Sequence, residues 1–162
     1  MRTAALLACL LAGSANVYPE ASSSTASRTT ENHPAVSATT QPPIITDTEV
    51  SGWVRRWQNR LGLSDWKIEA KIVRLAQLPK GTIANIHWSL PRKQATIKVL
   101  DSSDSTLPKG EIARDTELSV VHELVHLSMA KLPLDANNTE LEEEAVKKLS
   151  SALLTLAESE QK

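Results

Sequence analysis

The residues with the clearest potential for chemistry are His122 and His126, which frame Glu123 in the pattern HExxH. Residues four positions apart lie on the same face of a helix, so both imidazoles can bind one metal ion. Glu123 is rotated from His122 by roughly 100° on a helix of about 3.6 residues per turn, so it borders the metal without being a natural third ligand. That position suits a general base.

The surrounding sequence predicts a buried helix that begins near Ile112 and ends before Pro133. Apolar residues fall on both of its faces, with Leu118, Val121, Val125 and Met129 on one and Val120, Leu124 and Leu127 on the other. A single buried histidine is more often a core residue that is hydrogen-bonded to a neighbour. Two imidazoles and a carboxylate are costly to bury together, and a divalent cation with its bound water satisfies all three. We therefore favour a metal site.

The last helix, predicted from Thr139 to about Glu158, offers further acidic groups. Its expected buried stripe consists of Leu141, Ala145, Val146, Leu149, Ala152, Leu153 and Leu156. Glu142 lies near the centre of this stripe, whereas Glu143 and Glu144 rotate away from it. A carboxylate among apolar residues needs a partner, and an ion held by two histidines is a suitable one. Glu142 is therefore expected as the third ligand, and a solvated first turn that complements the helix dipole is the alternative.

This arrangement resembles the gluzincin metallopeptidases, in which two histidines and a downstream glutamate hold zinc. The chain looks like a minimal single-domain bacterial or phage-like member, and the resemblance covers roughly residues 53–156 as an order of elements. It implies His122 and His126 as zinc ligands, Glu123 as general base, and a peptide or protein as substrate. Some members show the pattern E-x-E-A after the active helix, which again makes Glu142 the ligand. The sequence pattern of other members would make Glu143 the third ligand, and Glu143 is our second choice.

The chain departs from this family in the residues that would support the site. Many gluzincins place Asp or Asn four residues after the ligand glutamate, but Val146 and Lys147 occupy those positions here. The domain also lacks a tyrosine that could stabilise an oxyanion. His87 is the candidate donor in its place, with Arg74 and Arg92 as weaker options, although a structural role for His87 is favoured.

The elements expected to position these residues form an α+β, zincin-like fold. A first helix is predicted from Thr48 to Leu61, with Asp47 as its cap and Gly62 as its stop. Alternating or apolar runs then predict strands at 66–75, 82–89 and 95–100, which we expect to form a small antiparallel sheet of about three strands. A polar loop at 101–110 leads into the HExxH helix, and the glutamate-bearing helix follows it.

The N-terminal third of the chain has a different composition. Residues 1–15 have one arginine, a short apolar run and small residues, which predicts a cleaved signal peptide and export to the periplasm or the exterior. Anchoring of a lipoprotein through Cys9 is disfavoured because this cysteine comes too early. Residues 16–46, rich in Ser, Thr and Pro, are expected to be a disordered linker. The folded domain is then 47–160.

Charge and size limit the functions to consider. A net charge of −1 gives no indication of nucleic-acid binding, and no run of residues suits a membrane span. We expect a monomeric zinc metallopeptidase that hydrolyses peptide bonds. The alternative is an exported, non-catalytic binding module, in which the metal stabilises a small core that has no disulfide.

Overall fold

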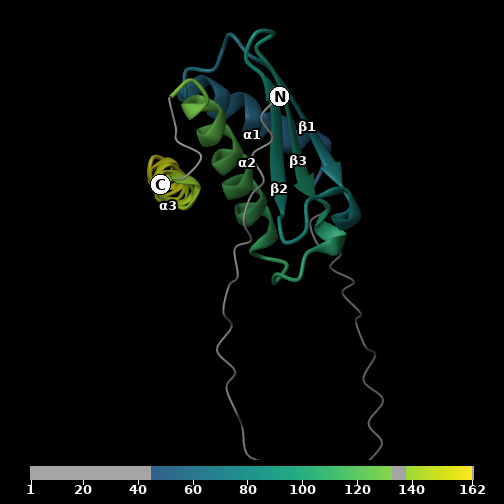
Figure 1. Ribbon diagram of the computed structural model, residues 1–162. Coiled ribbons are helices and arrows are strands. Elements are labelled where there is room, and N and C mark those ends of the chain that lie inside the picture. Colours follow the sequence, from purple (N-terminus) through teal and green to yellow (C-terminus); the bar gives the residue numbers. More distant parts are fainter. Residues whose placement is uncertain (1–44, 133–137, 162) are drawn as a thin grey trace, which may run out of the picture. The chain divides into compact units, whose positions relative to one another are not determined.

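The computed structural model describes residues 45–132 and 138–161 of the chain (Figure 1). The predicted signal peptide and linker lie outside this part, apart from Ile45 and Thr46. The described residues form three α-helices and one three-stranded mixed sheet, so the α+β class is confirmed. The elements in chain order are α1 (Asp47–Arg60), β1 (Lys67–Val73), η1 (Leu75–Gln77), β2 (Ala84–Ser89), β3 (Gln94–Leu100), η2 (Ser102–Asp104), α2 (Ile112–Met129) and α3 (Thr139–Ser159).

Local chemistry determines where α1 begins and ends. The Thr46 side chain accepts a hydrogen bond from the backbone N–H of Glu49, and the Glu49 carboxylate accepts one from the Thr46 N–H. This capping box makes Thr46 the cap instead of the expected Asp47, because only Thr46 has an acidic partner at the third helical position. Gly62 follows the helix with φ 66°, a conformation that glycine adopts at little cost, so the predicted stop is confirmed.

The sheet has the strand order β1-β3-β2, which corrects the prediction of an antiparallel sheet. β2 and β3 form the expected antiparallel hairpin around the turn at residues 90–93. β1, however, pairs with β3 in parallel, from Lys67 opposite Gln94 to Val73 opposite Leu100. The chain must therefore cross over between β1 and β3, and no local turn signal specifies such a pairing.

One face of the sheet packs against α1 and α2 to form the core (Figure 1). The core-facing residues of β3 are Ala95, Ile97 and Val99, which alternate with the less buried Thr96 and Lys98. On the helix side, Trp57 of α1 and Val120 and Leu124 of α2 are fully buried. Helix α2 is buried on nearly all sides, as its two apolar faces predicted.

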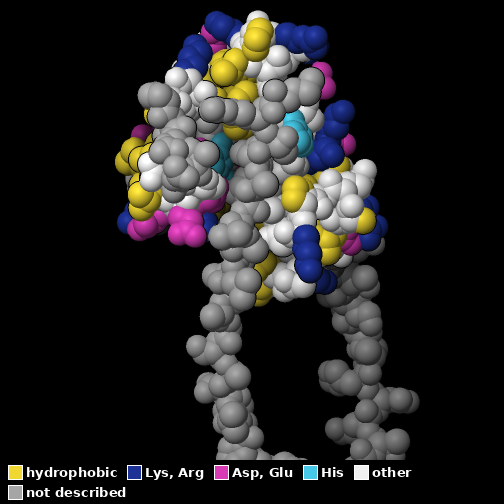
Figure 2. Space-filling view, in the orientation of Figure 1, with side chains coloured by type: hydrophobic (Ala, Val, Ile, Leu, Met, Phe, Trp, Pro, Cys, Tyr) yellow, Lys and Arg dark blue, Asp and Glu magenta, His cyan; other side chains and the backbone are white. Residues whose placement is uncertain are grey.

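Helix α3 packs against α2 through a face other than the predicted one. Its buried residues are Glu143, Val146, Ser150, Leu154 and Ala157. Leu141, Leu149 and Leu156, expected inside, are 64%, 48% and 57% exposed, and Figure 2 shows hydrophobic side chains on the outer surface of this helix. The buried face thus combines the small Ser150 and Ala157 with Val146 and Leu154, whereas these three leucines face outward. None of the helices in the described part of the chain has the length and apolar character needed to cross a membrane.

Candidate metal centre

Helix α2 places His122 and His126 on the same face, one turn apart, as the spacing predicted. The two Nε2 atoms lie 3.2 Å apart, and the ring centroids are 4.9 Å apart with the planes inclined by 70°. Both rings therefore direct the same nitrogen toward one point. Because His126 is 4% exposed, water has little access to the nitrogen that it turns inward.

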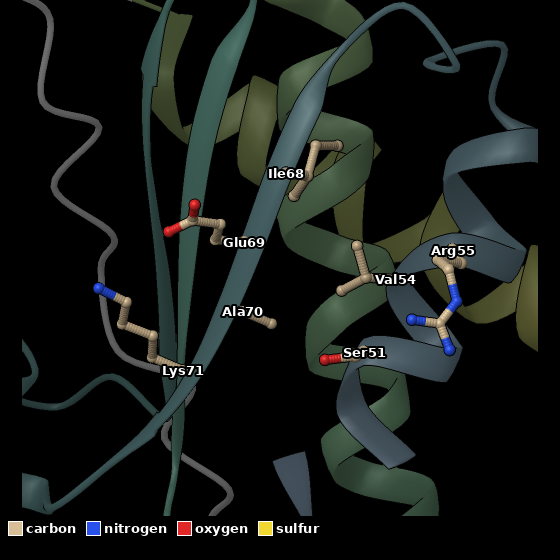
Figure 3. Close-up of a pocket in the computed structure, with 7 residues that line it drawn as sticks. All are labelled: Ser51, Val54, Arg55, Ile68, Glu69, Ala70 and Lys71. Carbon is tan, nitrogen blue, oxygen red and sulfur yellow. The ribbon is translucent and has the colours of Figure 1, made fainter. Parts of the chain in front are cut away.

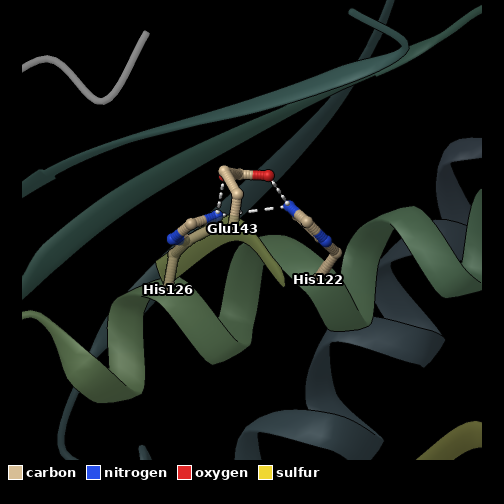
Figure 4. A group of neighbouring side chains, drawn as sticks. All are labelled: His122, His126 and Glu143. Atoms are coloured by element: carbon tan, nitrogen blue, oxygen red, sulfur yellow. Dashed lines mark hydrogen bonds and ion pairs between the residues drawn. The ribbon is translucent and has the colours of Figure 1, made fainter. Parts of the chain in front are cut away.

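Glu143 of α3 approaches these two nitrogens from the opposite side (Figure 4). Its Oε1 lies 2.8 Å from Nε2 of His126, and its Oε2 lies 3.6 Å from Nε2 of His122. One ligand atom from each of the three residues can be chosen so that all lie within 4.8 Å of one another. The two helices thus bring together two nitrogens and a carboxylate, which is a donor set suited to a divalent cation.

The two candidates for the third group lie in different places. Glu143, the second choice, points inward, whereas Glu142 lies on the flank of α3 and reaches the outer nitrogen of His126, with Oε1 3.2 Å from Nδ1. The physical reason is the rotation of α3, whose buried face is centred on Ser150 instead of on the leucine stripe. Glu144 is exposed and pairs with Lys148, as expected for a solvated position.

Glu123 is buried beside this cluster, 1% exposed, and its Oε2 has no hydrogen-bond partner. Burial raises the pKa of its carboxyl to about 7, with the nearby charges of His126 lowering it and Glu143 raising it. A carboxyl group with a pKa near neutrality can accept and return a proton at physiological pH. The predicted position of Glu123 next to the histidines, and outside the ligand set, agrees with this geometry.

The two histidines differ in their protonation. Burial lowers the pKa of His122 to about 4, and the charge of His126 acts in the same direction. Burial also disfavours the charged form of His126, but the contacts with Glu143 outweigh it and raise the pKa of this ring. In Glu143 burial is likewise outweighed by His126, so the pKa of its carboxyl is lowered. His126 and Glu143 thus favour each other's charged form, whereas burial favours the neutral form of His122.

Two buried carboxylate oxygens that lack a hydrogen-bond partner indicate that a cation fits this group. The Oε2 atoms of Glu123 and Glu143 are both buried, and neither has a hydrogen-bond partner. Buried carboxylate oxygens in proteins normally have a hydrogen-bond partner, so two such oxygens without one are unusual. An ion with its bound water would supply the missing partners, and His122, His126 and Glu143 are the residues that would hold it.

The candidate oxyanion donors are not brought to this cluster. His87 is exposed on β2 and alternates with Ile86, a core residue, so its ring lies on the sheet face that is turned away from α2. There it contacts the Asn85 amide at 3.1 Å. Arg74 is paired with Asp104, and Arg92 lies exposed in the hairpin turn.

A separate hollow lies between α1 and β1 (Figure 3). Val54 and Arg55 of α1 and Ile68 and Ala70 of β1 lie toward it, whereas Glu69 and Lys71 point to the other face of the sheet. Among the described residues, the group that could hold a metal ion lies elsewhere, between α2 and α3.

Comparisons with known proteins find no family model, curated protein or solved structure that matches this chain. The functional argument therefore depends on the residues and their geometry.

Proposed function

We propose that this protein is a zinc-dependent peptidase of the gluzincin type, with a zincin-like domain. The single observation that supports this most is the convergence of His122 and His126 with a buried carboxylate, Glu143, from the following helix. In this proposal the three residues hold the ion, and Glu142 does not. The donor set of two imidazoles and one carboxylate leaves a further position for water, as in catalytic zinc sites.

When bound there, the ion would polarise the substrate carbonyl and acidify a water molecule. Glu123 then acts as general base, because its buried carboxyl lies beside the histidines with an unpaired Oε2 that can take the proton of the attacking water. The same carboxyl returns that proton to the departing amine. His122 and His126 direct their Nε2 atoms toward the position of the ion, and a proton on Nε2 of His126 would have to leave before the ion binds. The apolar surroundings from α2 exclude bulk water from the site.

The alternative is a non-catalytic, metal-stabilised binding module. One observation favours it: in the described part of the chain, none of the expected oxyanion donors His87, Arg74 and Arg92 forms a hydrogen bond or ion pair with the two histidines. A bound ion would still stabilise so small a domain by joining α3 to α2 at this point. Both functions require the bound ion. They differ in whether the protein, with Glu123 as general base, hydrolyses a substrate.

The test compares metal content and proteolysis in the same preparations. The parent protein should contain about one zinc per chain and should cleave an unfolded, reduced protein substrate. Glu123→Gln should keep the zinc and lose cleavage, His126→Ala should lose both, and Glu144→Gln, a change of charge on the exposed side of α3, should lose neither. A parent that binds no divalent metal would refute the proposal, and a parent that binds zinc but cleaves nothing would support the binding module.

We also propose that the chain is exported, as its first residues suggest. Expression of the full-length protein followed by N-terminal sequencing of the product would test this, and a mature protein that begins near residue 16 is the expected result.

A further inference from the structure

His126 lies between two consecutive glutamates of α3. Its inward Nε2 is 2.8 Å from Oε1 of Glu143, and its outer Nδ1 is 3.2 Å from Oε1 of Glu142. Successive residues of a helix differ in direction by about 100°, so neighbouring carboxylates reach opposite edges of a ring that is placed between them. The His126 side chain is almost fully enclosed, and Glu142 is the group that covers its outer edge.

We infer that Glu142 is a positioning residue that fixes the ring of His126 for metal binding. This inference rests on the proposed function, since it assigns a role toward the ion that His126 would hold. An imidazole binds a cation through an unprotonated nitrogen, so the other nitrogen must carry the proton. A carboxylate at Nδ1 accepts a hydrogen bond from that N–H, selects the tautomer with a free Nε2 and holds the ring plane in place.

The partial burial of Glu142 strengthens this contact. Its side chain is 24% exposed against 3% for His126, so the hydrogen bond is largely shielded from water and salt. The chain lacks an acid or amide four residues after Glu143, where Lys147 stands, and Glu142 supplies the supporting carboxylate from a different position. The support comes from the residue that directly precedes the proposed ligand.

Among the described residues, only one of the two histidines has a hydrogen-bond partner at its outer nitrogen. In the described part of the chain, no residue forms a hydrogen bond to Nδ1 of His122, whose contacts are all made through Nε2. The loss of Glu142 should therefore disturb one ligand only. The three successive glutamates then have separate roles: Glu143 faces the ion, Glu142 orients His126, and Glu144 pairs with Lys148 on the surface.

The test measures zinc affinity by competition with a chromophoric chelator in Glu142→Ala, Glu142→Gln and the matched control Glu144→Gln. Glu142→Ala should weaken zinc binding roughly tenfold to a hundredfold, in the range found for lost supporting groups of metal ligands. Glu142→Gln retains a carbonyl acceptor and should recover part of that affinity. Glu144→Gln should stay within about twofold of the parent. Nitrogen-15 NMR of the zinc-loaded parent should show the His126 Nδ1–H as a protected signal, which Glu142→Ala should lose.

Each outcome separates this inference from the proposed function. If the parent binds zinc and Glu142→Ala binds it equally well with an unchanged Nδ1–H signal, the positioning role is refuted and the metal site stands. If the parent binds no zinc, the proposed function fails, and this inference fails with it. Should Glu142→Ala not fold, the ratio of affinities between Glu142→Gln and Glu144→Gln decides the question, and equality of the two would refute the role.

Discussion

The indole Nε1 of Trp57 donates a 2.7 Å hydrogen bond to Oε1 of Glu117, which joins α1 to the helix that bears both histidines. Trp57 is completely buried, and Arg56 pairs with the same carboxylate. The contact therefore links α1 to α2 through a mostly buried carboxylate.

Glu117→Ala should lower the free energy of unfolding by about 1–3 kcal/mol, because it leaves the buried indole N–H without an acceptor. Urea denaturation followed by tryptophan fluorescence would measure this loss. The matched control is Glu158→Ala, which removes an ion pair with Arg114 at the surface and should cost less than about 1 kcal/mol. Equal losses in the two variants would contradict a special role for the α1–α2 contact.

Zinc should stabilise the folded protein, because the three donors converge only when α3 is packed on α2. At a free zinc concentration about a hundred times the Kd, the free energy of unfolding should rise by about 2.7 kcal/mol. For a domain of this size that corresponds to a rise of roughly 10 °C in Tm. Calorimetry with added zinc, and then with a chelator, would show the rise and its reversal. His126→Ala should show no comparable shift, and a zinc-induced rise of the same size in that variant would place the ion elsewhere.

Glu123 should make the metal-free protein less stable as the pH rises. The pKa of a glutamate is 4.5 in the unfolded chain and about 7 for Glu123 in the folded one, so between these values the unfolded state has released a proton that the folded state retains. The contribution of Glu123 to the free energy of unfolding is therefore fully present below pH 4.5 and is lost as the pH rises to about 7. Glu123→Gln abolishes this loss, so the stability of the variant relative to the parent should increase by about 3 kcal/mol between pH 4 and pH 8.

The comparison of the variant with the parent is needed because His122 acts in the opposite sense. Its pKa falls from 6.5 to about 4 on folding, so the unfolded chain binds the extra proton and stability rises with pH over that window. This contribution is common to both proteins. Denaturation curves in the presence of a chelator at several pH values would measure the difference, and a constant offset between the two proteins would show that Glu123 is not buried as a neutral acid.

The rotation of α3 predicts different responses from two leucines on this helix. Leu154 is 2% exposed and packs in the core, so Leu154→Ala should cost about 2–5 kcal/mol of stability. Leu149 is 48% exposed, and Leu149→Ala should change stability by about 0.5 kcal/mol or less. Thermal unfolding of the two variants would test this, and a larger loss for Leu149 would restore the helix face that the sequence pattern predicted.

Much of the fold was predictable because its signals are local. The HExxH spacing and the two apolar faces around it predicted a buried helix with both histidines on one side, and α2 confirms this. The hairpin of β2 and β3 followed from alternation around a turn, and Gly62 ends α1 as expected. Each of these features depends on residues within a few positions of one another, where side-chain periodicity and backbone preference act directly.

Two features depended on tertiary structure. β1 pairs with β3 in parallel although β2 lies between them in the chain, and no turn residue encodes that choice. Helix α3 has apolar residues on two faces, so its periodicity alone allowed either to be buried and favoured the face with more leucines. The other face is the one that is buried, and it carries Glu143, which pairs with the imidazole of His126. The sequence by itself determined that His122, Glu123 and His126 share a buried helix, but only the packing of α3 decided which glutamate faces both inward nitrogens.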